Sequence, residues 1–157
     1  APPCTMFSIA RNDKTAKEKR DFRKGMETIK GCLNTVWKCR YEPIKKTENS
    51  LKFWVLENPR GYLIDFLGKP VYKFHPYYFG DPYTKRTCLW GNFNIPKENH
   101  TKPLNLGNFV QDVEHFFKLK LHQIPKDYQK KTKLPKRTII RSITPEKFAQ
   151  AFYQANK

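Results

Sequence analysis

Residues 51–59 read LKFWVLENP, and this stretch decides the fold class. The run 51–56 is rich in aromatic and β-branched residues and lies between a polar stretch and Asn58-Pro59, which is typical of a buried strand. Glu57 directly follows the run, at the edge where α/β sheets bind their ligands. Taken alone, a carboxylate here is better explained as a surface side chain or a helix cap. Glu57 therefore becomes a candidate site residue only together with a second motif.

Apolar residues recur at helical spacing on both sides of this strand. One stripe covers about 21–39, another runs over 110–121, and Thr144-Pro145 opens a last helix, because proline suits the first helical position. We expect three large aromatic residues in the core: Trp37, Trp54 and Phe148. The first stripe consists of Phe22, Met26, Ile29, Leu33, Val36 and Trp37.

The remaining segments read as short strands and polar connections. Strands are predicted at 71–74 and 87–93, with a loop between them at 79–85. Residues 9–21 predict a mobile polar loop, and 122–137 a basic connector. Helices and strands in this order predict an α/β fold.

Composition narrows the class of protein. The 157 residues suit one domain, and 15% aromatic residues supply a core, which argues against disorder. No apolar run approaches the length of a transmembrane helix, about 18 residues. The net charge of +17 favours a nucleic-acid partner. The alternative is a solvated, lysine-rich surface.

The four cysteines, at positions 4, 32, 39 and 88, include no Cys-x-x-Cys pair. Their spacing fits neither a disulfide framework nor a zinc site, so we expect free thiols, a reducing compartment and no metal. Cys4 follows Pro2-Pro3 and precedes the polar loop, which exposes its thiol. Considered alone, a cysteine near a terminus is more often incidental.

Considered together, two motifs resemble the cytosine-5 DNA methyltransferases. The segment Pro3-Cys4-Thr5-Met6-Phe7-Ser8 matches the family's catalytic Pro-Cys-x-x-Phe-Ser, and Glu57-Asn58 matches its Glu-Asn dipeptide. Pro59 stands where the family usually has valine. Residues 78–86, YFGDPYTKR, are similar to the family's Tyr-Gly-x-Pro-Gln-x-Arg-x-Arg hairpin, with one insertion. The second arginine of that hairpin falls on Cys88, so Lys85 or Arg86 would have to replace this donor.

The resemblance implies covalent catalysis on a cytosine flipped out of double-stranded DNA. Cys4 is then the nucleophile and Glu57 contacts the N3 and N4 edge of the base. Side chains that contact the base would be Pro3, Asn58, Lys85 and Arg86. Those that contact the DNA backbone would be Ser8, Arg11, Lys14, Lys17, Lys19 and Arg20. S-adenosylmethionine would donate the methyl group, but the family's Phe-x-Gly-x-Gly turn that holds it has no counterpart here, so a longer product or a second chain would supply the cofactor half.

The fold implied by the resemblance is a partial Rossmann-like methyltransferase sheet with flanking helices, incomplete at the N-terminus. Residues 1–93 would form the catalytic part, 94–136 a short DNA-recognition or connector region, and 137–157 the closing helix. We expect a cytoplasmic, DNA-associated protein with no membrane contact. One alternative is a non-catalytic basic DNA-binding protein derived from a methyltransferase. Another, resting on charge alone, is a basic structural or RNA-binding protein.

Overall fold

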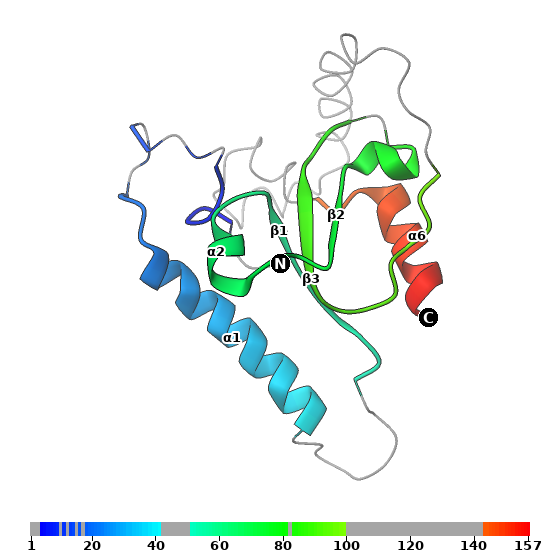
Figure 1. Ribbon diagram of the computed structural model, residues 1–157, viewed down its shortest axis with the longest axis horizontal. Coiled ribbons are helices and arrows are strands. Elements are labelled where there is room, and N and C mark those ends of the chain that lie inside the picture. Colours follow the sequence, from blue (N-terminus) through cyan, green and yellow to red (C-terminus); the bar gives the residue numbers. More distant parts are fainter. Residues whose placement is uncertain are drawn as a thin grey trace, which may run out of the picture. The chain divides into compact units, whose positions relative to one another are not determined.

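The computed structural model describes residues 4–9, 11, 13–14, 16, 18–41, 51–81, 83–99 and 143–157. The chain divides into two compact units. The first contains α1 (Phe22–Tyr41), β1 (Trp54–Pro59), α2 (Leu63–Leu67), β2 (Tyr72–Phe74) and β3 (Thr87–Asn92) (Figure 1). The second contains the 3-10 helix η1 (Pro76–Phe79) and all of α6 (Glu146–Asn156) except Asn156, which belongs to the first. The predicted helix at 110–121 and the connector at 122–137 lie outside the described residues.

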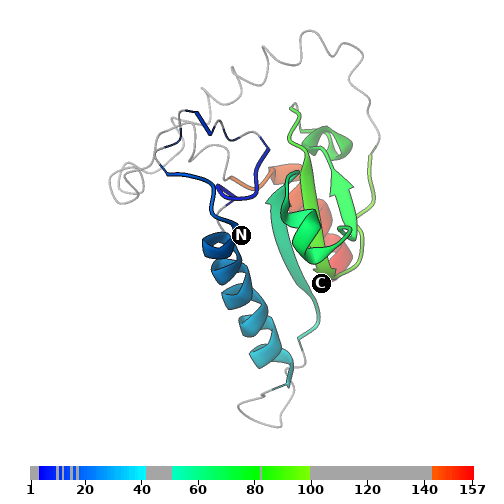
Figure 2. The ribbon, with the colours of Figure 1, turned by 60° about the vertical axis from the view of Figure 1, so that its left-hand side comes forward.

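The three strands form one antiparallel sheet in the order β1-β3-β2 (Figure 2). Both β1 and β2 pair antiparallel with β3, so they run parallel to each other on its two sides. The sheet and the helices confirm a mixed α/β fold. Within the described ranges no two neighbouring strands are parallel.

Strand β1 lies three residues further along the chain than predicted, at 54–59 rather than 51–56. Its register with β3 extends through Glu57↔Leu89, Asn58↔Cys88 and Pro59↔Thr87, so the Glu-Asn-Pro segment is inside the strand. Burial alternates along β1 instead of being continuous, because successive side chains of a strand point to opposite faces. The central strand β3 has four consecutive buried residues, so the side chains on both of its faces are covered there.

The other predicted strands are confirmed as β2 and β3, which form a hairpin. The connection between them begins with η1, which the sequence did not predict. Gly80 ends this turn in the left-handed region at φ 91°, where glycine has no steric penalty. Helix α2 was likewise not predicted from the sequence.

Helix α1 confirms the first apolar stripe. Asp21 begins it, because its carboxylate accepts the backbone N–H of Lys24 at 3.0 Å. Ile29 lies in one buried cluster with Leu56 and Trp90 of the sheet, so the middle of α1 contributes to the same core as the sheet. The expected core position of Trp37 is wrong, since this side chain is 59% exposed, whereas Trp54 packs against the cluster. Trp37 instead contacts Tyr41, with ring centroids 4.5 Å apart and ring planes tilted by 46°.

The second unit is organised by α6. Phe148 is buried as expected and packs edge-on against Phe79, with ring centroids 5.3 Å apart. Pro145 is the residue before the helix rather than its first helical residue. No helix in the described part of the chain has the length and apolar character needed to span a membrane.

Candidate functional site

The segment around Cys4 folds into a tight turn, the Cys4–Ser8 turn (residues 4–8). The backbone N–H groups of Phe7 and Ser8 both donate to the Cys4 carbonyl oxygen, at 3.0 and 2.8 Å. Met6 and Phe7 are buried in the core cluster, while Cys4 itself is only half-buried. The turn therefore anchors its apolar residues and leaves the thiol at the margin of the core.

This turn is attached to the chain that follows β1. The Tyr62 N–H donates to the Phe7 carbonyl at 2.8 Å, and Ser8 forms an antiparallel bridge with Gly61. A Cβ atom at Gly61 would lie 1.9 Å from the Phe7 carbonyl oxygen, so only glycine permits this approach. The two motifs are thus brought together, because Gly61 follows Glu57 by only four residues.

Asn58 is the most deeply buried of the candidate site residues. It is 0% exposed, and neither Oδ1 nor Nδ2 has a hydrogen-bond partner among the residues that the structure describes. Leaving a buried amide unsatisfied costs about 1–3 kcal/mol. A polar partner at this place, including a buried water molecule, would therefore stabilise the end of β1. Its neighbour Glu57 is half-buried, and the Oε1 atom of that carboxylate is shielded from solvent.

The start of β3 lies beside these residues. The Arg60 N–H donates to the Arg86 carbonyl at 3.0 Å, and Cys88 faces Asn58 in the register. Burial raises the pKa of the Cys88 thiol, although the positive charges of Lys73 and Arg60 oppose this effect. Cys88 therefore stays a neutral thiol near pH 7, unsuited to act as a nucleophile.

Two arginines of the predicted DNA-contacting loop lie on the Cys4–Ser8 turn. Arg20 Nη1 donates to the Met6 carbonyl at 2.7 Å and to the Ser8 carbonyl at 3.3 Å. Arg11 Nη1 donates to the Thr5 carbonyl at 3.3 Å, and its Nη2 donates to the Glu18 carbonyl. Both guanidinium groups are thus directed at the protein's own backbone.

Asp13 links these arginines, and sequence reasoning did not identify it. Its Oδ2 accepts from Arg20 Nε and Nη2 at 3.2 and 3.1 Å. Its Oδ1 lies 2.9 Å from Arg11 Nε, an ion pair without hydrogen-bond alignment. The spacing Arg-x-Asp over 11–13 was the available signal, but it says nothing of Arg20.

The other candidate residues differ in setting. Lys14, Lys19 and Arg86 are exposed, and Ser8 is half-buried. Lys85 is half-buried and belongs to the second unit, whereas the other described candidates belong to the first. Pro3 and Lys17 lie outside the described residues.

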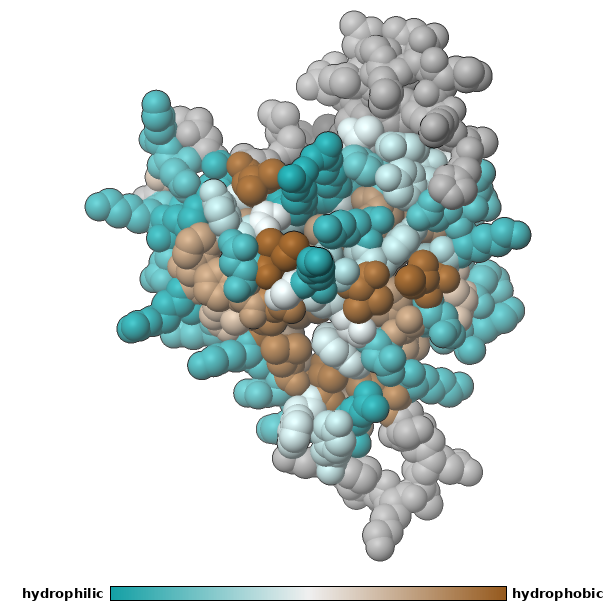
Figure 3. Space-filling view, in the orientation of Figure 1, coloured by the Kyte–Doolittle hydropathy of each residue, from teal (hydrophilic) through white to brown (hydrophobic). Residues whose placement is uncertain are grey.

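In the space-filling view, hydrophilic side chains on the visible surface are interrupted by hydrophobic ones (Figure 3).

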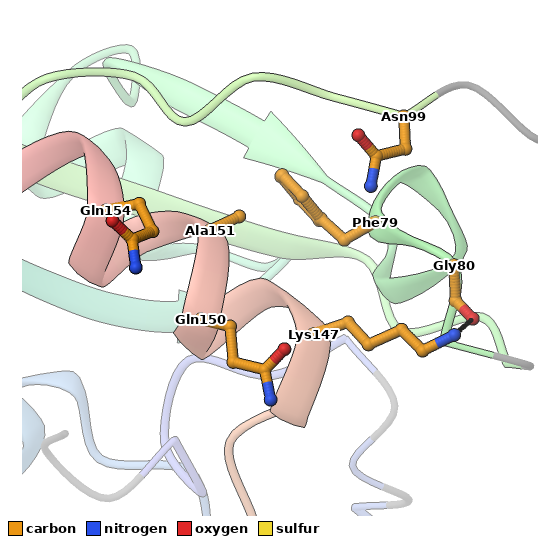
Figure 4. Close-up of a pocket in the computed structure, with 7 residues that line it drawn as sticks. All are labelled: Phe79, Gly80, Asn99, Lys147, Gln150, Ala151 and Gln154. Atoms are coloured by element: carbon orange, nitrogen blue, oxygen red, sulfur yellow. Dashed lines mark hydrogen bonds between the residues drawn. The ribbon is translucent and has the colours of Figure 1, made fainter.

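The second unit has a pocket of about 650 Å³ lined mainly by polar side chains of α6 and by η1. Lys147 extends along it, and its Nζ donates to the Gly80 carbonyl at 2.9 Å (Figure 4). None of the candidate site residues lines this pocket. The lining residues are Phe79, Gly80, Asn99, Lys147, Gln150, Ala151 and Gln154.

Asp81, in the segment similar to the family's hairpin, caps helix α6. The backbone N–H groups of Lys147 and Phe148 donate to its carboxylate, which satisfies donors that a helix start leaves open. Burial nevertheless raises the pKa of the Asp81 carboxyl. Asp81 stands at the variable position between Gly80 and Pro82 of the hairpin motif, so this capping role does not account for the resemblance.

The described residues offer no site for a metal or for S-adenosylmethionine. No group of three metal-ligating side chains occurs among them. Their glycines at positive φ are Gly68, Gly80 and Gly91, and none lies in a turn between a strand's end and a helix N-terminus of the phosphate- or cofactor-binding kind. These residues therefore do not fit the cofactor.

No protein-family model, curated protein or solved structure matches the chain.

Proposed function

We propose that this chain carries the nucleophile and the base-contacting residues of a cytosine-5 DNA methyltransferase. The observation that carries the proposal is the attachment of the Cys4–Ser8 turn to Gly61 and Tyr62, directly after Glu57-Asn58. The thiol and carboxylate motifs lie 53 positions apart in the sequence, and the fold joins their backbones. A chance combination of two short motifs would give no reason for this pairing.

The chemistry needs a thiolate and a group that protonates the ring. The Cys4 thiolate adds to C6 of the cytosine, and the new S–C6 bond shifts the C5=C6 electron pair into a C4=C5 bond. The N3=C4 pair moves onto N3, where Glu57 supplies the proton. C5 thereby becomes an enamine carbon able to attack an electrophile, so one difficult step is divided into two easier ones.

The buried amide of Asn58 lies on the face of β1 opposite to Glu57, because successive side chains of a strand point to opposite faces. Neither of its polar atoms has a hydrogen-bond partner among the described residues. A base edge that donates and accepts hydrogen bonds, or a further protein segment, would satisfy them. Either occupant would complete the hydrogen bonding of Asn58.

S-adenosylmethionine is the methyl donor in this proposal. Because the described residues do not fit this cofactor, a second chain or another segment would have to hold it. The steps derived for Cys4 and Glu57 do not depend on how the donor is bound.

A partial Rossmann-like sheet is the finer fold that accompanies this function. In its support, β1 and β2 run parallel to each other with β3 antiparallel between them. Doubly wound sheets can include an antiparallel strand at their edge, whereas β3 lies between the other two strands. Double-stranded DNA is the proposed partner, since the net charge of +17 favours a polyanion.

A non-catalytic DNA-binding protein is the second candidate, and Cys88 favours it. This residue stands where the resemblance expects an arginine, and it is a buried, neutral thiol. If the lost arginine is needed for catalysis, the charge and the fold would remain useful only for binding.

The test is a covalent trap that needs no methyl donor. Duplex DNA carries 2-pyrimidinone in place of cytosine, because this analogue lacks the amino group and its C6 is more electrophilic. We expect a denaturation-resistant adduct that mass spectrometry assigns to Cys4 and that Cys4→Ser abolishes. Cys39→Ser is the matched control, because Cys39 is exposed on α1. DNA binding without any adduct, or an adduct formed equally by Cys39, would replace the enzyme by the DNA-binding alternative.

A further inference from the structure

We infer that Arg20 is a positioning residue for the nucleophile, rather than a phosphate contact. That Cys4 acts as a nucleophile is part of the proposed function, on which this inference rests. That Arg20 holds the Cys4–Ser8 turn follows from the hydrogen bonds alone. With Arg11 and Asp13, Arg20 forms what we call the arginine latch (Arg11, Asp13 and Arg20).

The latch completes the hydrogen bonding of the Cys4–Ser8 turn. The Cys4 carbonyl accepts from within the turn, and the Phe7 carbonyl accepts from Tyr62. The carbonyls of Thr5, Met6 and Ser8 accept from the guanidinium groups of the latch. Every carbonyl of the turn therefore has a donor, although residues 5–7 belong to no helix or strand.

Arg20 is held in this place from several directions. Its guanidinium lies over the Tyr62 ring at 4.9 Å and the Phe22 ring at 5.8 Å, and it pairs with Asp13. Its side chain is only 15% exposed. Arg20 thus connects the turn to the start of α1 and to the segment after β1. A planar, five-donor guanidinium suits such a role, whereas a lysine ammonium does not.

This geometry separates the latch from the lysines of the same loop. An arginine engaged by three protein groups would have to break charge-assisted hydrogen bonds before it reached a phosphate. Lys19 is exposed and lies next to Arg20 in the chain. The contact with the DNA backbone therefore falls to lysines such as Lys19, and the arginines hold the turn that carries the thiol.

Hydrogen exchange tests the inference without requiring methyl transfer. The Phe7 and Ser8 amides bond to the Cys4 carbonyl, so their exchange rates report on the turn itself. In Arg20→Ala we expect these two amides to exchange about 10- to 100-fold faster, since hydrogen bonds to charged groups are lost. The Ile29 amide, in the middle of α1, should keep its rate. Arg20→Lys should show a smaller increase, because one ammonium replaces only part of the fork.

Matched variants separate positioning from DNA contact. Lys19→Ala should lower the salt slope of DNA binding by about 1 and leave the exchange rates unchanged. Arg20→Ala should leave that slope unchanged, and adduct formation at Cys4 should slow in proportion to the opening of the turn. Arg23→Ala, an equal charge loss at an exposed site on α1, should leave both the exchange rates and the adduct formation unchanged.

Each outcome decides the inference. Unchanged exchange at Phe7 and Ser8, or a lower salt slope in Arg20→Ala, would make Arg20 a phosphate contact. If the amides throughout α1 exchange faster in Arg20→Ala by the same factor as those of Phe7 and Ser8, Arg20 stabilises the whole fold rather than the turn. If Arg20→Ala does not fold, Asp13→Asn should still accelerate exchange of the same two amides, and its failure to do so would overturn the inference. If the parent chain forms no adduct but the exchange pattern holds, the proposed function fails and the latch remains.

Discussion

Two glycines of helix α1 provide the sharpest test of how closely this helix packs against the turn that carries Cys4. Gly25 and Gly31 both lie inside α1. A Cβ atom at Gly25 would lie 2.9 Å from Met6 Cβ and 2.9 Å from Phe7 Cζ, whereas a Cβ atom at Gly31 would meet nothing within 4 Å. The same substitution to alanine therefore separates helix propensity from packing against the Cys4–Ser8 turn.

The expected magnitudes follow from these contacts. Replacing an interior helical glycine by alanine stabilises by about 1 kcal/mol, and Gly31→Ala should show this gain. Gly25→Ala should gain the same amount but lose about 1–3 kcal/mol to overpacking, because Met6 Cβ cannot move without its backbone. The two variants should therefore differ by about 1–3 kcal/mol in free energy of unfolding.

Urea denaturation followed by circular dichroism measures both variants against the parent. In thermal melts the difference corresponds to about 2–4 °C for each kcal/mol in a chain of this size. Gly25→Ala should also accelerate exchange of the Phe7 and Ser8 amides, whereas Gly31→Ala should not. Equal stability of the two variants would refute the reasoning, because it would mean that α1 does not approach the turn closely.

Further expectations concern the reaction, DNA binding and pH. With a donor-binding partner present, Cys4→Ser should abolish methyl transfer and leave DNA affinity nearly unchanged in a filter-binding assay. Glu57→Gln should slow transfer by about 100- to 10,000-fold, because an amide cannot supply the proton; near-parental turnover in either variant would contradict the proposed roles. If about six phosphates are contacted, the log–log salt slope of DNA binding should be near −5, and a slope near zero would exclude a phosphate-dominated interface. Because burial raises the pKa of Asp81 above its usual 3.8, the folded state holds this proton more tightly, so stability should fall as pH rises above about 4. Asp81→Asn should remove this part of the pH dependence in urea titrations at several pH values, and an identical pH profile would refute that assignment.

Burial, rather than charge, distinguishes the loop's arginines from its lysines. The sequence presents five basic residues between Arg11 and Arg20 as equivalent. In the structure Arg11 and Arg20 have side chains only 10% and 15% exposed, while Lys14 and Lys19 are exposed. A long flexible side chain can point into the protein or into solvent. For Arg11 and Arg20, the backbone carbonyls of the Cys4–Ser8 turn decide that it points into the protein.

Local periodicity and motif order were readable from the sequence. The stripe from Phe22 to Val36 fixed α1, because helical spacing is a property of neighbouring residues. The apolar runs indicated the three strands, although β1 lies three residues later than its run, and the motifs around Cys4 and Glu57 suggested a shared site. Tertiary structure alone decided the register that put Asn58 opposite Cys88, the glycine contacts that attach the turn to Gly61, and the cap that Asp81 provides for α6. These features join residues far apart in the sequence, and no local pattern encodes which distant group a backbone N–H or carbonyl will meet.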